Sequence, residues 1–285
     1  MAIRICVAGA TGYLGQHVVA ELVNREYDVH ALARSTAKAA HLEELGAHPH
    51  LVEVTQPETL QGVLDGVEIV VSSLGITRQR DGLRFEDVDF QANLNLLREA
   101  ERAGVRRFVY VSVFRGQELR HTALVGAKER FVDALIESPI EHCVIRPTGF
   151  FSDLEEFLQM ARRGRAWLIG DGQQELNPIH GADLAAAIAD SLETNAEIVD
   201  VGGPETLTTQ RMAELAFEAV GGSPKLSRVP QWLCNTVETG LPLVTPQSIS
   251  GPIQMFLAAS RLPMVAPAYG ERRLGEFFAE HAAAG

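Results

Sequence analysis

Short apolar segments rich in valine and isoleucine recur along the first 150 residues of the chain. They are apolar at successive positions, which is typical of strands that are buried on both faces of a parallel sheet. The segments that we predict as strands are Ile3–Ala8, Asp28–Ala33, His50–Val54, Val67–Ser72, Arg107–Ser112 and Glu141–Arg146.

Segments with helical spacing of their apolar residues lie between these strands. They are Leu14–Arg25, Ala37–Leu45, Glu58–Leu64, Phe85–Ala103 and Leu124–Glu137. A chain that alternates strands and helices in this way forms right-handed crossovers. The pattern therefore predicts an α/β fold with a doubly wound parallel sheet, that is, a Rossmann fold.

The pattern becomes weaker after Pro147. Thr208 is expected to cap a helix that extends through Val220. We expect a dinucleotide-binding domain at residues 1–150 and a smaller substrate or lid region at 151–285, partly interleaved with the first by a strand. The remaining predicted elements are helices at Asp153–Arg163 and Ala182–Glu193 and that strand, Glu197–Val201.

The stretch Leu241–Pro267 differs from the rest of the chain because it carries one charge, Arg261, and five prolines. An irregular lid or interface segment is the favoured interpretation. A segment lying on a membrane surface is the alternative, but prolines break the helix that such a segment needs.

A glycine-rich turn follows the first predicted strand and precedes a predicted helix. Its sequence is Gly9-Ala10-Thr11-Gly12-Tyr13-Leu14-Gly15. The first glycine permits a tight turn, the second lets the backbone approach a pyrophosphate, and the third lets the helix pack against the strand. The helix N-terminus adds N–H donors and a partial positive charge. The turn therefore predicts a dinucleotide site, with a glycine turn that binds nothing as the alternative.

The residues at the end of the second strand distinguish the two nicotinamide dinucleotides. An NAD site needs a carboxylate there for the ribose hydroxyls, but this chain has Arg34 followed by Ser35. A guanidinium suits a 2′-phosphate, and Lys38 is near enough along the chain to contribute. We therefore predict a preference for NADP(H) and leave NAD(H) open; a solvated surface arginine is the alternative.

Composition and charge exclude several functions. With 46% hydrophobic residues the chain is not disordered. A net charge of −12 argues against a nucleic-acid partner. The three cysteines form no CxxC pair, so neither a metal site nor a disulfide framework is predicted. A strand predicted near Met1 leaves no room for a signal peptide, and no apolar run would span a bilayer. We expect a cytoplasmic protein with a small-molecule substrate.

Several further motifs join the glycine-rich turn in a resemblance to the atypical short-chain dehydrogenase/reductases. This family includes isoflavone-reductase-like enzymes and regulators of the nitrogen-metabolite-repression type, and its members bind NAD(P)H. The resemblance extends to about Gly222. The motifs that carry it are Gly9–Gly15, Phe108–Val113, Val144–Phe151, Asn177–Leu184 and Gly202–Thr208.

The resemblance implies further contacts with the cofactor. They belong to segments that follow or end predicted strands, where ligands of doubly wound sheets bind. The implied residues are Glu53 and Val54 at the adenine, Ser73, Leu74 and Gly75 along the ribose and nicotinamide, and Pro147, Thr148, Gly149 and Phe150 at the carboxamide.

The family's usual catalytic pair, a tyrosine four residues before a lysine, is absent from this chain. Lys128 nevertheless stands where the family's lysine reaches the nicotinamide ribose. The chain uses three lysines among 25 basic residues, so a lysine here favours a role specific to an ammonium group. As a catalytic candidate, Lys128 would orient the ribose and could donate a proton to the substrate. A solvated helix lysine is the alternative. Ser112, which ends the fifth predicted strand, is a second catalytic candidate as a hydroxyl donor.

Three histidines invite functional interpretations. His48 and His50 flank a proline and lack a third ligand, so a loop that leads into a strand is favoured over a metal pair. His180 could protonate a substrate. A histidine that is hydrogen-bonded to the backbone at the start of a helix is the favoured interpretation.

Two classes of function stay open. The first is an NADPH-dependent reductase of a small carbonyl compound or conjugated alkene. The second is a non-catalytic sensor that binds NADP(H). A nucleotide-sugar epimerase or dehydratase is a third hypothesis, which the missing tyrosine weakens. The sequence determines neither the substrate nor the oligomeric state.

Overall fold

The computed structural model describes residues 2–76, 82–230, 232, 245 and 247–283. The chain divides into two compact units, each built from separate segments. Unit 1 comprises Met1–Ser112, Gly116–Arg146 and Ala185–Val199. Unit 2 comprises Val113–Arg115, Pro147–Leu184 and Asp200–Gly285.

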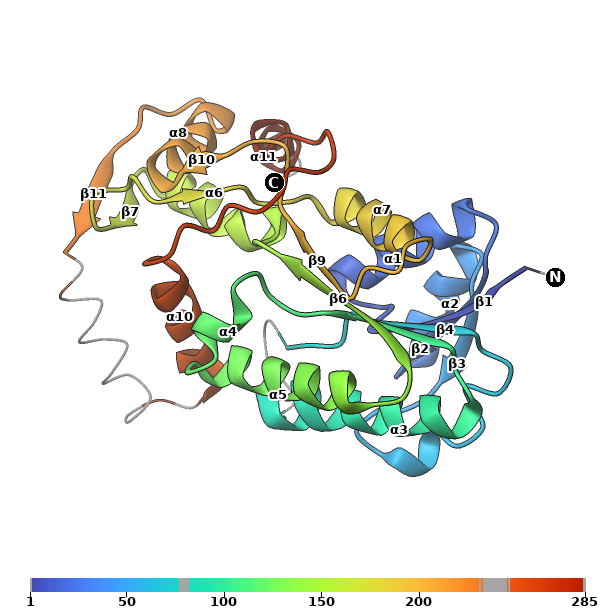
Figure 1. The fold of residues 1–285 in the computed structure, drawn as a ribbon. Helices are drawn as coiled ribbons and strands as arrows, with labels where there is room; N and C mark the ends of the chain where they lie inside the picture. Colours follow the sequence, from blue (N-terminus) through green and yellow to red (C-terminus); the bar gives the residue numbers. More distant parts are fainter. Residues whose placement is uncertain (1, 77–81, 231, 233–244, 246, 284–285) are drawn as a thin grey trace. The chain divides into compact units, whose positions relative to one another are not determined.

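Unit 1 is built around a seven-stranded sheet with the order β3-β2-β1-β4-β5-β6-β9 (Figure 1). The strands from β1 to β6 pair in parallel, and the order reverses between β1 and β4. The doubly wound α/β fold predicted from the sequence is therefore confirmed. The strands are β1 Arg4–Ala8, β2 Asp28–Ala33, β3 His48–Leu51, β4 Ile69–Ser72, β5 Arg107–Val111, β6 Glu141–Pro147 and β9 Ile198–Val201.

Helices cover both faces of this sheet, with α3 and α5 on one face and α1 on the other (Figure 1). Cys6 and Ala8 pack into the core beneath α3 and α5. Ile5 and Val7 point to the other face and are also fully buried, which explains the continuous apolar pattern. The helices are α1 Tyr13–Asn24, α2 Thr36–Glu44, α3 Asn93–Ala103, α4 Gly116–Leu119, α5 Ala123–Glu137 and α7 Gly181–Ser191, with one 3₁₀ turn η1 Pro57–Thr59 and one π-helix η2 Glu86–Ala92.

Several predictions for unit 1 are wrong in detail. The predicted helix Phe85–Ala103 begins as the π-helix η2, and the predicted strand Val67–Ser72 begins at Ile69. The helix expected at Glu58–Leu64 is only the single turn η1, because Gly62 adopts a φ of +79°, which interrupts a right-handed helix. The strand expected at His50–Val54 begins two residues earlier and ends at Leu51. Pro49 is tolerated in it because β3 lies at the edge of the sheet.

Unit 2 has a helical core and two small sheets, β10–β8 antiparallel and β11–β7 parallel. Phe157, Met212 and Phe278 are among the side chains that fill its core. The predicted cap is confirmed, since Thr208 Oγ1 accepts the N–H of Arg211 at 3.1 Å. The elements are η3 Phe151–Leu154, α6 Glu155–Arg162, β7 Ala166–Ile169, β8 Glu175–Leu176, β10 Leu207–Thr208, α8 Thr209–Ala219, β11 Leu226–Val229, α10 Gln247–Ala259 and α11 Leu274–Ala283.

The irregular segment expected at Leu241–Pro267 is wrong for its central part, which forms helix α10. Ser250, Leu257 and Ala258 are buried, and their spacing of seven and eight residues places them on one helical face. Residues 241–244 and 246 lie outside the described residues. No helix within the described ranges is long and apolar enough to cross a membrane.

Candidate cofactor site

The glycine-rich turn connects β1 to α1 at the carboxyl end of the strand. Gly9 has a φ of +79°, which favours glycine, and its carbonyl accepts the N–H of Gly12 at 2.9 Å. A Cβ on Gly15 would collide with that carbonyl, so the third glycine permits the close approach of α1. Gly12 is exposed, and an added Cβ would meet only the Gly9 oxygen, at 3.3 Å. The turn is therefore open at Gly12, which fits a pyrophosphate.

The N-terminus of α1 points to the same place. Within the described residues no side chain caps this helix, and no acid lies in its first turn. The first N–H groups and the positive end of the helix dipole are thus left without a neutralising side chain. Tyr13 is 37% exposed and packs edge-on against His17, whereas Leu14 is buried. This arrangement suits a bound phosphate.

The segment after β4 lies directly against the turn. Ser73 donates two hydrogen bonds to the carbonyl of Ala8, from its N–H at 3.0 Å and from Oγ at 3.2 Å. A Cβ on Gly9 would stand 2.8 Å from that Oγ. Because β1 and β4 are neighbours where the strand order reverses, this is the crevice in which doubly wound sheets bind ligands. The structure thus brings Ser73 and Leu74 against Gly9 of the turn, whereas Gly75 lies against Lys128.

The residues predicted for the adenosine half follow β2 and β3. Arg34 and Ser35 are exposed after the end of β2, and the Ser35 hydroxyl does not cap α2. Glu53 is half-buried, and its carboxylate accepts the hydroxyl of Thr55 at 2.9 Å. Val54 is buried. Their contacts with the cofactor stay predictions.

Lys128 projects from α5 into a buried polar cluster. Its side chain is 12% exposed, and Nζ lies 3.1 Å from Oδ1 of Asp89, which is completely buried. The ammonium also lies 5.4 Å from the ring centre of Tyr110. Burial alone lowers the pKa of Lys128, but Tyr110 and Asp89 raise it above its ordinary value. Burial raises the pKa of Asp89 in turn, and the Lys128 charge opposes that rise. An ammonium in this position is suited to holding an anionic or hydroxyl-rich ligand.

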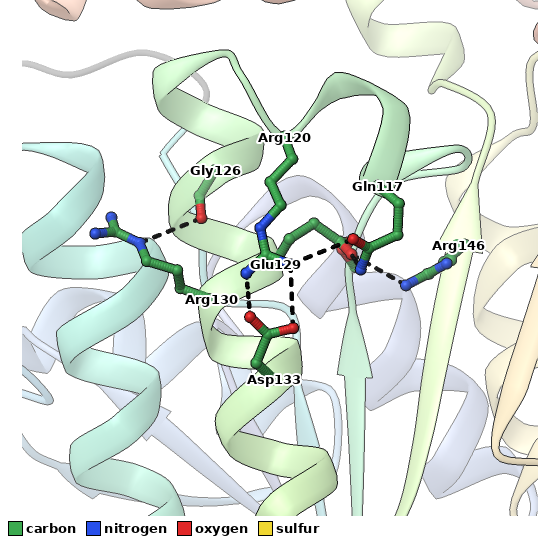
Figure 2. A network of polar contacts seen from close by, with 8 residues as sticks. Gln117, Arg120, Gly126, Glu129, Arg130, Asp133 and Arg146 are labelled. Atoms are coloured by element: carbon green, nitrogen blue, oxygen red, sulfur yellow. Dashed lines mark hydrogen bonds and ion pairs between the residues drawn. The ribbon is translucent and has the colours of Figure 1, made fainter.

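Ser112 belongs to a separate network around a second buried carboxylate, Glu129. Figure 2 shows the Gln117 and Arg146 side of this network. Glu129 accepts hydrogen bonds from Ser112 Oγ at 2.7 Å, Gln117 Nε2 at 2.6 Å and Arg146 Nη2 at 3.1 Å. A Cβ on Gly116 would collide with this carboxylate. The network ties β5, α4, α5 and β6 together, and the Ser112 proton points at Glu129.

The segment predicted to hold the carboxamide, Pro147–Phe150, begins a part of unit 2. Several of its polar groups bond within that unit. The carbonyl of Pro147 accepts the N–H of Phe114 at 2.9 Å, and the carbonyl of Gly149 accepts the N–H of Ile179 at 2.8 Å. Thr148 donates its hydroxyl to a backbone carbonyl at 2.6 Å. A role of this segment toward the cofactor stays a prediction.

The histidines take structural positions. Nδ1 of His180 accepts the N–H of Ala182 at 3.1 Å and its ring packs on Phe151, which confirms the backbone-bonded interpretation. His48 and His50 lie in β3 itself rather than in a loop before it. In the part of the chain that the structure describes, no group of His, Cys, Asp or Glu side chains is arranged to hold a metal ion.

Asp89 and Glu129 are the two residues that sequence reasoning missed. Each lies in a predicted helical segment, where acids are usually solvated, and Glu129 is also flanked by Lys128 and Arg130. One signal existed for Glu129: Arg146 lies in a predicted buried strand, and a buried guanidinium needs a carboxylate. Nothing comparable marked Asp89.

A family model described as NAD(P)H-binding matches residues 9–195 of this chain. The divinyl chlorophyllide a 8-vinyl-reductase, chloroplastic, of Arabidopsis thaliana is 29% identical over 321 residues, covering 98% of this chain and 76% of its own length. The photosystem II assembly factor Ycf39 of Guillardia theta is 28% identical over 231 residues, covering 79% of this chain and 73% of its own length.

Among solved structures, the Citrobacter sp. triphenylmethane reductase complexed with NADP(H) aligns with a TM-score of 0.76. The alignment covers 98% of this chain and 99% of that one at 19% identity, and so shows a shared fold.

Proposed function

The chain belongs to the NAD(P)H-binding family, and on that premise we propose that it is an NADPH-dependent reductase of a small carbonyl compound or conjugated alkene. Membership confirms the family resemblance and the nicotinamide cofactor predicted from the sequence. The observation that carries the proposal is the position of the buried Lys128 ammonium. It lies beside Gly75, in the segment whose Ser73 contacts the glycine-rich turn. The vinyl reduction named for the Arabidopsis relative supports an alkene as one substrate class.

Bound NADPH would supply a hydride from its nicotinamide and be oxidised, and the substrate would take up that hydride and a proton from solvent. The chain's part is to bind and orient. The turn at Gly12 and the N-terminus of α1 hold the pyrophosphate, Arg34 pairs with the 2′-phosphate, and Lys128 holds the ribose. Because its pKa is raised, Lys128 is suited to anchoring rather than to giving up a proton.

A non-catalytic NADP(H) sensor is the second candidate. Tyr110, the phenol beside Lys128, is completely buried in the sheet core and is not placed to protonate a substrate. Ser112 donates its proton to Glu129. Both observations favour a protein that binds the cofactor without acid catalysis, and they also count against an epimerase.

The preference for NADPH over NADH tests the proposed cofactor binding. Calorimetric titration is expected to show NADPH binding more tightly than NADH by about 1.5–3 kcal/mol, or roughly ten- to a hundredfold. Arg34→Ala should lose this preference, while Arg98→Ala, which removes an exposed arginine of α3, should keep it. Equal affinities in the wild-type protein would contradict the role of Arg34.

Turnover separates the reductase from the sensor. NADPH oxidation is followed with a panel of carbonyl compounds and conjugated alkenes. For an authentic substrate, Lys128→Ala should weaken NADPH binding about tenfold or more and lower kcat/KM with it. Lys225→Ala, an exposed lysine of unit 2, is the control. Full turnover and unchanged NADPH affinity in Lys128→Ala would remove Lys128 from the site.

A further inference from the structure

We propose that Asp89 is a positioning residue for the cofactor, which fixes the Lys128 ammonium against Gly75. The inference rests on the proposed function, because it assumes that Lys128 contacts bound NADPH. Asp89 Oδ1 lies 3.1 Å from Lys128 Nζ, and the Asp89 side chain is 0% exposed. A carboxylate is costly to bury unless it is paired, so its presence here needs a reason.

The local structure that turns Asp89 inward is the π-helix η2. A π-helical turn leaves backbone carbonyls without their usual partners, and the buried amide of Asn93 supplies them. Its Nδ2 donates to the carbonyls of Val88 at 3.2 Å and Asp89 at 3.1 Å. Its Oδ1 accepts the hydroxyl of Ser72, at the end of β4, at 2.6 Å. The helix turn is thus fixed to the strand that precedes the cofactor segment.

Asp89 also contacts that cofactor segment directly. Its Oδ2 accepts the N–H of Ile76 at 3.2 Å. A Cβ on Gly75 would stand 2.8 Å from Asp89 Oδ1 and 2.9 Å from Lys128 Nζ. The ammonium therefore lies against bare backbone, and one carboxylate joins η2, the segment after β4 and Lys128.

The surroundings of Lys128 indicate that Asp89 affects both the charge of the ammonium and the direction in which the side chain points. Among the residues that the structure describes, the titratable groups that face Lys128 are Asp89 from η2 and Tyr110 from β5, and the Val111 carbonyl lies 3.5 Å from Nζ. Burial lowers the pKa of an unpaired ammonium, so loss of the Asp89 charge would favour neutral Lys128 or turn the side chain toward water. Either change would weaken its hold on a ligand.

Asp89→Asn is the direct test because it removes the charge and keeps the shape. We expect NADPH affinity, measured by calorimetry at pH 7.5, to fall about tenfold. Asp87→Asn is the matched control: it lies on the same turn, its side chain is 34% exposed, and it pairs with Arg84. That variant should bind NADPH as the wild type does. Equal affinity in Asp89→Asn and wild type would overturn the inference.

A double-variant cycle separates this inference from the proposed function. If Asp89 acts through Lys128, Asp89→Asn should have little further effect on NADPH affinity in a Lys128→Ala background. Independent, additive losses would overturn the inference and indicate general damage to the fold. If Lys128→Ala alone leaves affinity unchanged, the proposed role of Lys128 fails first.

The pH dependence of NADPH affinity, compared between the wild type and Asp89→Asn, tests the same idea. With Asp89 in place the Lys128 pKa is raised, so NADPH affinity should stay constant from pH 7 to about pH 10, near the ordinary lysine value. In Asp89→Asn the affinity should begin to fall at lower pH. A decline in the wild type that is centred well below pH 10 would overturn the inference.

Discussion

The three glycines of the turn respond differently to one added carbon. Gly12 has φ −81° and ψ 171°, which any residue can adopt, and an added Cβ would meet only the carbonyl oxygen of Gly9, at 3.3 Å. We predict that Gly12→Val keeps the fold and abolishes binding of NADPH, because its side chain occupies the space of the pyrophosphate. Circular dichroism checks the fold and calorimetry the affinity.

Gly15→Val provides the comparison at the same turn. Its Cβ would collide with the backbone at Gly9, so this variant should lower the melting temperature of the protein itself, by roughly 2–4 °C for each kcal/mol lost. A folded Gly12→Val protein with unchanged NADPH affinity would show that the turn is not the phosphate site.

The roles of residues in short motifs could be predicted from the sequence, because these roles depend on neighbours along the chain. The turn at Gly9–Gly15 needed only its neighbours along the chain, and so did Arg34 at the end of β2. Asp89 and Glu129 were missed because their partners are remote in sequence. Lys128 lies 39 positions from Asp89, and only the fold brings the two together.

At the scale of elements, the edge of the sheet carries three histidines on neighbouring strands. His30 of β2 and His50 of β3 share a hydrogen bond of 2.7 Å between ring nitrogens, so one ring accepts and cannot be protonated at that nitrogen. Asp28 Oδ1 lies 3.4 Å from His30 and 3.5 Å from His48, and Arg4 pairs with the same carboxylate. Burial lowers the pKa of His30, although Asp28 opposes this, and burial also lowers the pKa of His50.

This edge should make the stability of unit 1 sensitive to mild acid. A histidine with a lowered pKa in the folded state binds fewer protons there than in the unfolded chain. Stability is therefore complete above the unfolded value, about 6.5, and is lost as pH falls toward the folded pKa. We expect the melting temperature to fall between pH 7.5 and 5.5, and less steeply in His30→Gln. His41→Gln, an exposed histidine of α2, should follow the wild type; identical slopes in all three would contradict this account.

Helices and strands with a regular hydrophobic pattern were predictable from the sequence. Elements whose conformation depends on a single residue or on tertiary packing were not. The strand Asp28–Ala33 was predicted with its exact bounds, because its apolar run is flanked by polar turns. The π-helix η2 has the same hydrophobic spacing as an ordinary helix start. The Asn93 amide that binds two of its carbonyls is itself held by Ser72 of β4, a contact that only the folded chain makes. For α10 the prolines favoured an irregular segment in the sequence prediction. The buried face of this helix becomes evident only in the structure.

For the whole molecule, the chain passes repeatedly between the two units. The segment Ala185–Val199 returns to unit 1 after a long excursion and contributes the last turns of α7 and part of β9. Arg107 is only 2% exposed and donates hydrogen bonds to the carbonyls of Thr194 and Ala196 on this segment. The N–H of Val144 in β6 donates to the carbonyl of Glu197 at 2.8 Å. The hydrophobic pattern predicted the strand β9, but it did not predict that Arg107 would bind the segment before that strand.

A fragment of residues 1–150 is therefore expected not to fold cooperatively, although it contains the whole glycine-rich turn and Lys128. It lacks the acceptors of the buried Arg107, and removing the partners of a buried charge costs about 3–5 kcal/mol. That loss is comparable with the total stability of many domains, about 5–15 kcal/mol. Thermal melting followed by circular dichroism, with and without NADPH, is the measurement.

The matched control restores the missing segment. Residues 1–146 are joined through a flexible linker of about 15 residues to 185–199, which returns the Thr194 and Ala196 carbonyls to Arg107. This chain should melt cooperatively, and NADPH at 100 times its Kd should stabilise it by about 2.7 kcal/mol. Introducing Arg107→Leu into the 1–150 fragment removes the unpaired charge and should recover part of the lost stability. Cooperative melting of the unmodified 1–150 fragment at the temperature of the joined chain would show that the returning segment does not support unit 1.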